Sequence, residues 1–299
     1  LSAAKAANAS VKFSYRPVAL FVGGTSGIGR ATVEAFARYT KGDAHIIIIG
    51  QNEAAATEVL SSLYKSPSST YEFLPCNATL MSNVSAACKS LTSNSTSSSA
   101  GSRPLTKLNF LFMTPGILST RGFTPTSEGI DRKLSLNFYT RFKFAMELAP
   151  LLEAAADAGE DARVISVLAP GTGRKIDAQD LGLKKSYTLI RAASMASTAN
   201  DLMVQEFSER HPKLSFTHIH PGFVLTSFGD ASIFMRMIKP LLRLLLTSPQ
   251  DCAEFMLRAL FDPAAAKGAF HRNNHAELMD PSKLPISPED QKLVYDHLV

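Results

Sequence analysis

Short apolar runs alternate with amphipathic helical patterns along most of the chain. The run Val18–Val22 and the β-branched run at 45–49 are almost continuously apolar, which is typical of parallel strands that helices cover on both faces. Between them, residues 30–39 place Ala31, Val33 and Phe36 on one helical face. The same patterns predict further strands at 71–74, 108–113, 162–168, 214–219 and 268–271, and further helices at 54–63, 83–91, 127–152, 249–261 and from 288. No linker is long enough to divide the chain, so one α/β domain over residues 1–299 is expected.

The first apolar run leads directly into a glycine-rich turn, and a helical pattern follows it. Glycines let the backbone turn sharply and approach a pyrophosphate, whose charge then lies against the free N–H groups of the helix. A chance glycine turn is the alternative, but the strand before it and the helix after it favour a dinucleotide-phosphate cradle. The residues expected to form that cradle are Gly23, Thr25, Ser26, Gly27, Ile28, Gly29 and Arg30.

The spacing Gly23-x-x-x-Gly27-x-Gly29 resembles the fingerprint of the short-chain dehydrogenase/reductase family, Thr-Gly-x-x-x-Gly-x-Gly, with Val22 in place of the Thr. A second segment, which begins at Pro221, is similar to the family's Pro-Gly-x-Val-x-Thr. The resemblance spans roughly residues 16–261. It implies a Rossmann-like doubly wound parallel sheet of about seven strands with helices on both faces. It also implies a nicotinamide site formed by Pro221, Gly222, Val224 and Thr226.

The resemblance implies a nicotinamide dinucleotide cofactor, and NADP(H) is favoured over NAD(H). An Asp at the tip of the second strand would repel a 2′-phosphate. Gln51 and Asn52 stand at this tip, and Arg30 lies nearby in the sequence. The remaining expected cofactor contacts follow the third and fourth strands and are Asn77, Ala78, Pro115 and Gly116.

The family's reacting groups are an Asn, a Ser and a Tyr-x-x-x-Lys pair. Asn137 matches the Asn, within Leu136-Asn137-Phe138. Alignment of the fifth strand puts Ala169 at the position of the Ser. We find no Tyr-x-x-x-Lys pair in the region, so the catalytic set is degenerate.

Two registers remain open for the helix that follows the fifth strand. In one register, Tyr187 and Arg191 keep a positive charge one turn from a phenol. In the other, Leu189 and Ala193 occupy the two catalytic positions, and Tyr187 precedes the helix near the pocket mouth. His220 is a further candidate for proton transfer because imidazole titrates near neutral pH, with a packed, hydrogen-bonded histidine as the alternative.

The segment 227–247 is expected to cover the substrate, and its apolar composition implies an apolar small-molecule substrate. Arg236, Lys239 and Arg243 are interleaved in it, so contact with a membrane surface is the less favoured alternative. The leading hypothesis is an NADP(H)-dependent oxidoreductase acting on a hydrophobic carbonyl or alcohol, with secondary metabolism as one setting. The alternative is a nucleotide-binding scaffold without ordinary redox chemistry, which serves as a cyclase, an isomerase or a regulatory binder.

Composition limits the remaining function classes. The net charge of +5 comes without a long basic run, so nucleic-acid binding is not expected. Cys76, Cys88 and Cys252 lie far apart, which argues against a zinc site or a disulfide framework and predicts a reducing, cytoplasmic setting. Residues 1–15 are interpreted as an N-terminal extension without a signal-peptide core, and residues 281–299 as a C-terminal cap. The family resemblance also implies a homo-oligomer.

Overall fold

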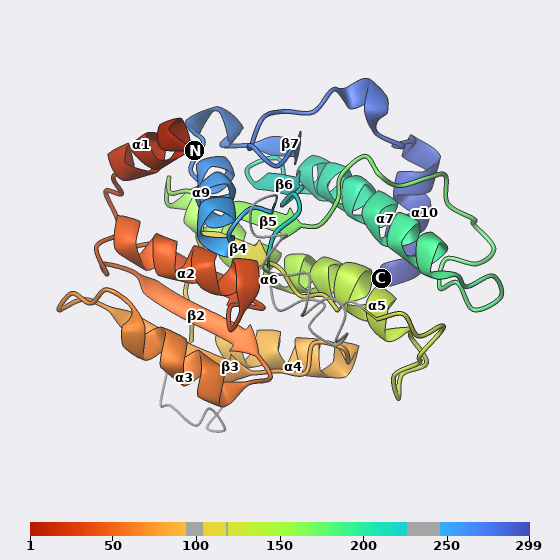
Figure 1. Cartoon of the computed structure of the whole chain (residues 1–299), viewed down its shortest axis with the longest axis horizontal. Coiled ribbons are helices and arrows are strands. Elements are labelled where there is room, and N and C mark those ends of the chain that lie inside the picture. Colours follow the sequence, from red (N-terminus) through yellow and green to blue (C-terminus); the bar gives the residue numbers. More distant parts are fainter. Residues whose placement is uncertain (94–103, 118, 226–245) are drawn as a thin grey trace.

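Seven parallel strands form one sheet in the order β3-β2-β1-β4-β5-β6-β7 within the described part of the chain. The computed structural model describes residues 1–93, 104–117, 119–225 and 246–299. The expected doubly wound α/β fold with about seven strands is therefore confirmed (Figure 1). The strands are β1 Val18–Val22, β2 His45–Gly50, β3 Thr70–Pro75, β4 Phe110–Met113, β5 Arg163–Val167, β6 Ser215–Ile219 and β7 Gly268–Arg272.

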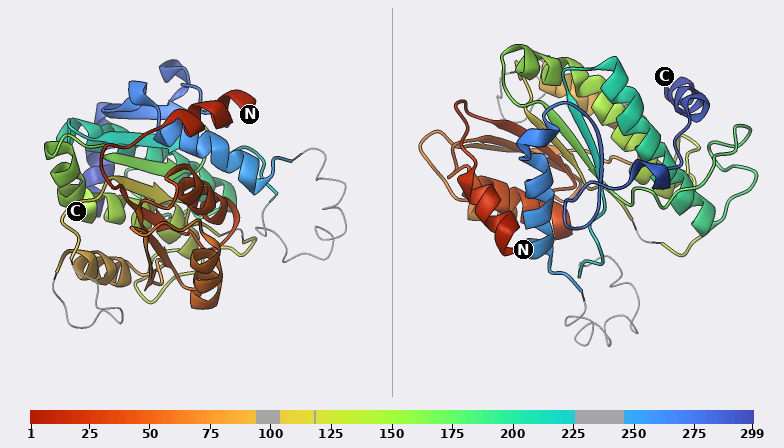
Figure 2. Two further views of the ribbon diagram at one scale, coloured as in Figure 1. Left: turned by 90° about the vertical axis from the view of Figure 1, so that its left-hand side faces the viewer. Right: turned by 90° about the horizontal axis from the view of Figure 1, so that it is seen from above.

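Helices cover both faces of the sheet (Figure 2). Their bounds are α1 Ser2–Ser10, α2 Gly27–Tyr39, α3 Glu53–Ser62, α4 Met81–Thr92, α5 Arg132–Leu134, α6 Thr140–Asp157, α7 Leu189–Arg210, α9 Pro249–Leu260 and α10 Pro288–Leu298. Short 3₁₀ turns span Pro263–Ala265 and Pro281–Lys283. None of the helices in the described ranges has the length and hydropathy needed to cross a bilayer.

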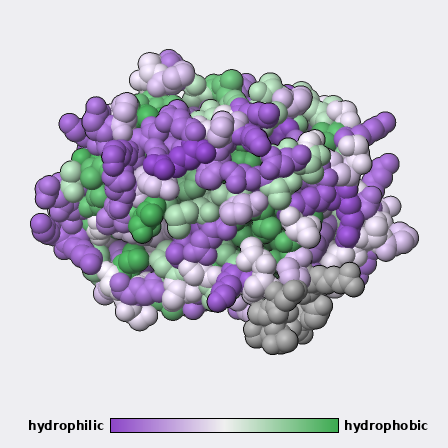
Figure 3. All heavy atoms as spheres, turned by 180° about the vertical axis from the view of Figure 1, so that it is seen from behind, coloured by the Kyte–Doolittle hydropathy of each residue, from purple (hydrophilic) through white to green (hydrophobic). Residues whose placement is uncertain are grey.

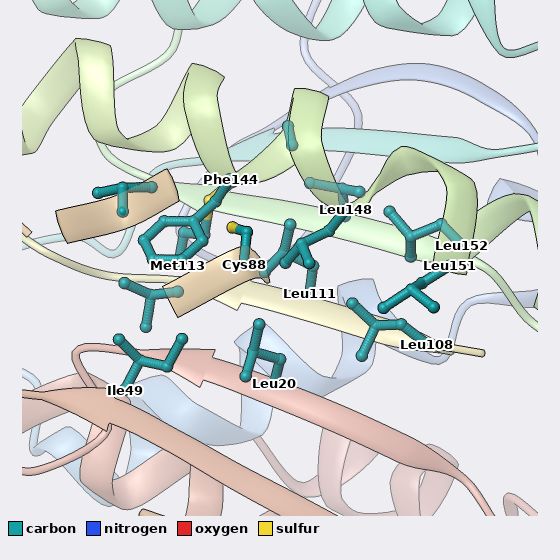
Figure 4. Close-up of a cluster of buried hydrophobic side chains, with 14 of the residues drawn as sticks. Leu20, Ile49, Cys88, Leu108, Leu111, Met113, Phe144, Leu148, Leu151 and Leu152 are labelled. Carbon is teal, nitrogen blue, oxygen red and sulfur yellow. The ribbon is translucent and has the colours of Figure 1, made fainter. Parts of the chain in front are cut away.

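The alternation of side chains along β1 explains why both faces are apolar. Leu20 and Val22 face a cluster supplied by α4, α6 and α7, while Ala19 and Phe21 face α2, α3 and α9. Figure 4 shows the first cluster, in which side chains of α6 lie over the sheet beside Cys88 of α4. On the face opposite to that of Figure 1, apolar residues form small separate patches among hydrophilic ones (Figure 3).

The chain runs from β1 to β3 in one direction and then returns to build β4 to β7 in the other. The carboxyl ends of β1 and β4 therefore adjoin at the point where the strand order reverses. In doubly wound sheets this switch point is the place where ligands bind. The glycine turn after β1 and the segment after β4 meet there.

The long helix predicted at 127–152 begins later than expected. The N–H of Thr126 donates to the carbonyl of Ile130 at 2.8 Å, and Gly129 has a φ of +75°, so these residues form a tight turn. The carboxylate of Asp131 then caps the first helical N–H groups. A π-helical turn, Ser135–Tyr139, joins α5 to α6.

Both ends of the chain pack on the sheet's helices. In α1, the Nδ2 of Asn8 donates to the backbone carbonyl and to Oε2 of Glu254 in α9, each at 2.9 Å. The predicted C-terminal cap contains α10, which packs against α7 with Val294 buried. Most of the segment expected to cover the substrate, 227–245, lies outside the described residues.

Candidate functional site

The glycine turn after β1 has a backbone conformation that favours glycine. Gly23 and Gly27 have φ values of +90° and +54°, in the left-handed region that favours glycine. A Cβ on Gly29 would lie 2.3 Å from the carbonyl oxygen of Gly23. The turn is therefore folded tightly on itself, and its backbone is left bare of side chains where a phosphate would approach.

Thr114, the first residue after β4, holds the turn from the neighbouring strand. Its Oγ1 donates to the carbonyls of Val22 and Gly23, each at 3.3 Å, and its N–H donates to Val22 at 2.9 Å. The family places Asn-Asn-Ala-Gly here, of which only Gly116 is present. In this chain the hydroxyl of Thr114 supports the glycine turn.

The N-terminus of α2 remains open for an anion. Its N-cap residue, Ser26, makes no side-chain capping hydrogen bond, and the first turn contains no acidic residue. In α3, by contrast, Asn52 caps the helix by accepting a hydrogen bond from the N–H of Ala55 at 2.9 Å. The uncapped N–H groups and the helix dipole of α2 suit a phosphate. The cradle therefore fits a dinucleotide.

The residues expected at the adenosine ribose lie at the tip of β2. Gln51 and Asn52 are exposed there, and neither carries a carboxylate. Arg30 forms ion pairs with Glu34 at 2.8 Å and with Glu58 at 2.9 Å. The hydrogen bond to Glu34, ahead of that to Glu58, raises the pKa of Arg30. Its guanidinium is thus paired with two carboxylates.

Asn77 and Ala78, expected near the adenine, form a turn after β3. The Oδ1 of Asn77 accepts hydrogen bonds from the N–H of Thr79 at 3.2 Å and from its Oγ1 at 2.7 Å. The carbonyl of Ala78 accepts a hydrogen bond from Thr140 in α6. Asn77 remains a predicted cofactor contact, with a side-chain oxygen that already accepts two hydrogen bonds from Thr79.

A buried arginine that no sequence motif revealed lies beneath the ends of β4 and β5. Arg141 donates to the carbonyl of Pro115 at 2.7 Å, to Ser166 Oγ at 2.7 Å and to the carbonyl of Val167 at 2.8 Å. Burial lowers the pKa of Arg141 to about 9. Within the described ranges it forms no ion pair with a carboxylate. The guanidinium fixes the backbone of Pro115, one of the predicted cofactor residues.

The arginine is one end of a buried polar chain that reaches Asn137. Ser166 Oγ donates to Asn200 Oδ1 at 2.6 Å, and Asn200 Nδ2 donates to the carbonyl of Asn137 at 2.7 Å. Asn137 lies in the π-helical turn, a distortion that recurs at functional sites. Its main chain is thereby anchored to α7.

Ala169, which stands at the position of the family's Ser, is held by a buried histidine. The N–H of Ala169 donates to His218 Nε2 at 3.1 Å, so the proton of this ring lies on Nδ1 and is donated to Asp201 at 2.7 Å. The other carboxylate oxygen of Asp201 accepts from the N–H of Gly171 at 3.0 Å. His218 and Asp201 thus fix the loop after β5. Sequence reasoning did not single them out.

The structure does not bring Tyr187 and Arg191 together. Tyr187 precedes α7, donates to Asp131 Oδ1 at 3.3 Å and packs its ring against Lys133. Burial, followed by the charge of Asp131, raises the pKa of Tyr187 to about 12. Arg191 instead lies 3.7 Å from the carboxylate of Asp177. Tyr187 thus lies before α7, as the second register expected.

His220, Pro221 and Gly222 directly follow β6. The N–H of Gly222, whose φ is +75°, donates to His220 Nδ1 at 2.9 Å, so His220 carries its proton on Nε2. Burial, and then the neighbouring His218, lower the pKa of His220. Its Nε2 has no hydrogen-bond partner among the residues described.

Beyond Gly222 the chain pairs with the segment just before α9. Val224 forms a parallel bridge with Thr247, and the N–H of Leu225 donates to the carbonyl of Thr247 at 2.9 Å. Phe223, between Gly222 and Val224 in the sequence, is 82% exposed. Thr226 lies outside the described residues.

The three cysteines are buried and free among the described residues. Burial raises the pKa of Cys76 to about 11 and that of Cys252 to about 12, so neither is a thiolate near neutral pH. They pack as small apolar side chains.

The sequence matches the family model described as short chain dehydrogenase over residues 17–175. It is 38% identical to the oxidoreductase AN1596 of Emericella nidulans over 76% of this chain and 64% of that protein. It is 30% identical to the short-chain dehydrogenase/reductase SAT2 of Stachybotrys chartarum over 84% of this chain and 74% of that protein. The chain thus spans less than two thirds of AN1596.

Solved structures support the same fold. The NADPH-bound carbonyl reductase from chicken fatty liver superposes with a TM-score of 0.63 at 18% identity, covering 89% of this chain and 99% of that one. At this identity the likeness extends to the fold alone.

Proposed function

This chain belongs to the short-chain dehydrogenase family, and we propose that it is an NADP(H)-dependent oxidoreductase acting on the carbonyl or alcohol group of a hydrophobic substrate. The observation that carries the proposal is the cradle, in which Thr114 donates a hydrogen bond to the glycine turn beside the uncapped N-terminus of α2. The Pro-Gly segment after β6 supplies the opposite end of the same site.

Each part of the cofactor has assigned residues in this proposal. The glycine turn and the first N–H groups of α2 would hold the pyrophosphate, and Pro115, Pro221 and Gly222 would hold the nicotinamide. When bound, the cofactor supplies or accepts a hydride. Arg141 positions Pro115 from beneath, and Asn200 holds Asn137.

His220 is the better placed of the two candidate proton donors. Tyr187 already donates its hydroxyl proton to Asp131, and its pKa is raised, so it is a poor acid. Nδ1 of His220 accepts a hydrogen bond from the N–H of Gly222, while Nε2–H has no partner among the described residues. In reduction, we propose that His220 acts as an imidazolium, whose formation requires Nδ1 to give up the hydrogen bond from the N–H of Gly222, and that its Nε2–H protonates the carbonyl oxygen as hydride reaches the carbon.

The preference for NADP(H) rests on Arg30. No acidic residue follows β2 at Gln51 or Asn52 to repel a 2′-phosphate, and Arg30 supplies a cation at the start of α2. The structurally similar chicken carbonyl reductase was crystallised with NADPH. Glu34 and Glu58 hold Arg30 in place, and a 2′-phosphate would have to compete with them for its guanidinium.

A nucleotide-binding scaffold without redox chemistry is the second candidate function. It is favoured by the alignment that puts Leu189 and Ala193, both exposed in α7, at the family's Tyr and Lys positions. No cation on α7 then reaches a nicotinamide ribose in the family's way. An activity that depends on pocket shape would not need one.

Titration with NADPH and NADH, followed by nicotinamide fluorescence, tests the cofactor site. Consumption of NADPH is then measured against a panel of apolar ketones. Turnover supports the oxidoreductase, and tight binding without turnover supports the scaffold. If neither nucleotide binds, both functions are wrong. Arg30→Gln should weaken NADPH binding about fivefold and leave NADH binding nearly unchanged, since a partly exposed charge pair contributes about 1 kcal/mol.

A further inference from the structure

A groove of about 300 Å³ lies beside the first two turns of α7. Its floor is apolar and consists of the buried side chains of Ile176, Leu183 and Met195. Because α7 follows β5 in a parallel sheet, these first turns lie at the carboxyl edge, where the cradle also lies (Figure 1). The groove has the size of a small-ligand site and opens at the functional edge of the molecule.

The rim of the groove is strongly basic. Arg174, Lys175 and Arg191 line it against a single carboxylate, Asp177, which lies 3.7 Å from Arg191. Arg174 and Lys175 are exposed and form no ion pair with any described residue. The rim therefore has an excess of two positive charges, from three cations and one carboxylate.

The wider segment concentrates the charge of the whole chain. Residues 174–191 contain five cations and two carboxylates, a net charge of +3 out of the total of +5. The second carboxylate, Asp180, accepts hydrogen bonds from the N–H of Ser186 at 2.9 Å and from its Oγ at 2.7 Å. It does not line this groove but the neighbouring one, together with Lys184 and Lys185.

Tight packing fixes the basic rim on α7. A Cβ on Gly173 would lie 2.0 Å from Thr198 Oγ1, so only glycine allows this approach. Thr198 Oγ1 donates to the carbonyl of Arg174 at 2.8 Å. The backbone that carries Arg174 and Lys175 is thus anchored to the helix, and the groove is a defined feature of the fold.

An apolar side chain continues the floor outward. Ile190 lines the groove and is 74% exposed, next to the half-exposed Arg191. An apolar residue and cations side by side favour a ligand that is itself amphiphilic. A concave floor with buried side chains fits a single extended chain better than a flat bilayer surface.

We propose that this groove binds the carboxylate of an amphiphilic substrate, with Arg174 and Lys175 holding the anion and the apolar floor holding the adjoining chain. The inference rests on the proposed oxidoreductase function and narrows its substrate class to hydrophobic carboxylic acids that carry a carbonyl or hydroxyl group. The helix dipole at the start of α7 adds to the attraction.

Decanoate and decan-1-ol are the probes, and their dissociation constants are measured by calorimetry at low salt. Decanoate should bind about tenfold more tightly, as two partly exposed ion pairs allow. The difference should shrink when the ionic strength is raised to about 1 M, where the Debye length is about 3 Å. Equal affinity for the two probes would overturn the proposal.

The variant Arg174→Gln/Lys175→Gln should lose the preference for decanoate. Lys184→Gln/Lys185→Gln is the matched control, because it removes the same charge from the same segment but lines a different groove. The control should keep the preference. If both variants lose it equally, a diffuse field and not a site attracts the anion, and the proposal fails.

Two further measurements distinguish the groove from a membrane-binding surface and from the cofactor site. In sedimentation with phosphatidylserine vesicles, vesicle binding that depends on Arg174 and Lys175, with decanoate affinity unchanged, would contradict the proposal. NADPH titration of the same proteins tests the cofactor site independently. Decanoate preference without NADPH binding refutes the proposed function but not the groove, whereas ketone turnover without decanoate preference refutes only the groove.

Discussion

Arg141 donates a hydrogen bond to Ser166 across 2.7 Å, and both side chains are buried beneath the carboxyl ends of β4 and β5. A buried cation without a carboxylate partner is costly, so its retention requires that its hydrogen bonds compensate for its desolvation. The guanidinium joins a helix to two strands at the point where the cofactor is expected.

Arg141→Met should therefore destabilise the protein by roughly 3 kcal/mol, since it leaves buried carbonyls of Pro115 and Val167 without their donor. Urea unfolding followed by circular dichroism measures the change. Arg132→Met, at an exposed arginine of α5, is the control and should change stability by less than about 0.5 kcal/mol. Equal stability of the two variants would show that the buried guanidinium contributes nothing.

Gly29→Ala should weaken NADPH binding by at least about tenfold, because the new methyl group displaces the Gly23 carbonyl and disturbs the turn. Losing one charge-assisted hydrogen bond costs about 1.5–3 kcal/mol. Fluorescence titration measures the affinity. Gly122→Ala is the control, since a Cβ at Gly122 meets nothing within 4 Å. Unchanged affinity in Gly29→Ala would mean that the turn is not the phosphate site.

Stability should fall as the pH is lowered from about 6.5 to about 4. Burial lowers the pKa of His271 to about 4, opposed by Asp201 and reinforced by His218, so the folded protein keeps this ring neutral. The unfolded chain takes up a proton near pH 6.5, and between the two values it binds more protons than the folded state does. The loss amounts to roughly 2–3 kcal/mol, because each pKa unit corresponds to about 1.4 kcal/mol.

Urea unfolding at several pH values checks this window. His271→Gln should show a smaller loss over the same range, and a residual loss should remain because His220 and His297 also have lowered pKa values. An unchanged pH dependence in His271→Gln would assign the effect to other groups.

His220→Gln should reduce ketone reduction by about a hundredfold, the lower range for a general acid, with NADPH affinity unchanged. Tyr187→Phe should alter the rate by less than about threefold. The pKa of His220 is lowered, so imidazolium is scarce at neutral pH, and reduction should accelerate as the pH falls towards that pKa. Initial rates measured across pH test this. A large loss of rate in Tyr187→Phe would instead show that the Tyr187 hydroxyl donates the proton.

The strands could be predicted because a buried parallel strand appears in a sequence as a short, almost continuously apolar run. The bounds of β1 were predicted to the residue, and β2 differs only by Gly50 at its end. The first residues of the helices were harder to predict. α2 begins at Gly27, three residues before the predicted span 30–39, because Gly27 and Gly29 have no side chains that could contribute to an apolar stripe.

The site could be predicted only where function constrains the backbone. The glycine turn and the Pro-Gly segment are sequence-local, so spacing revealed both. Arg141, Asn200 and His218 act through contacts between distant elements, which no spacing encodes. Arg141 did leave one signal, because it lies on the same helical stripe as the apolar Phe138 and Ala145, where a charged residue is unexpected.

The pairing of β1 with β4 also bears on how this protein folds. Ala19 pairs with Phe110, 91 residues further along the chain, whereas β1, β2 and β3 all lie within the first 75 residues. Closing so long a loop is slow compared with forming local turns. The glycine turn can therefore form early, but Thr114 reaches it only after β4 has docked. Nucleotide should accordingly bind only late intermediates, and it should slow unfolding more than it speeds refolding.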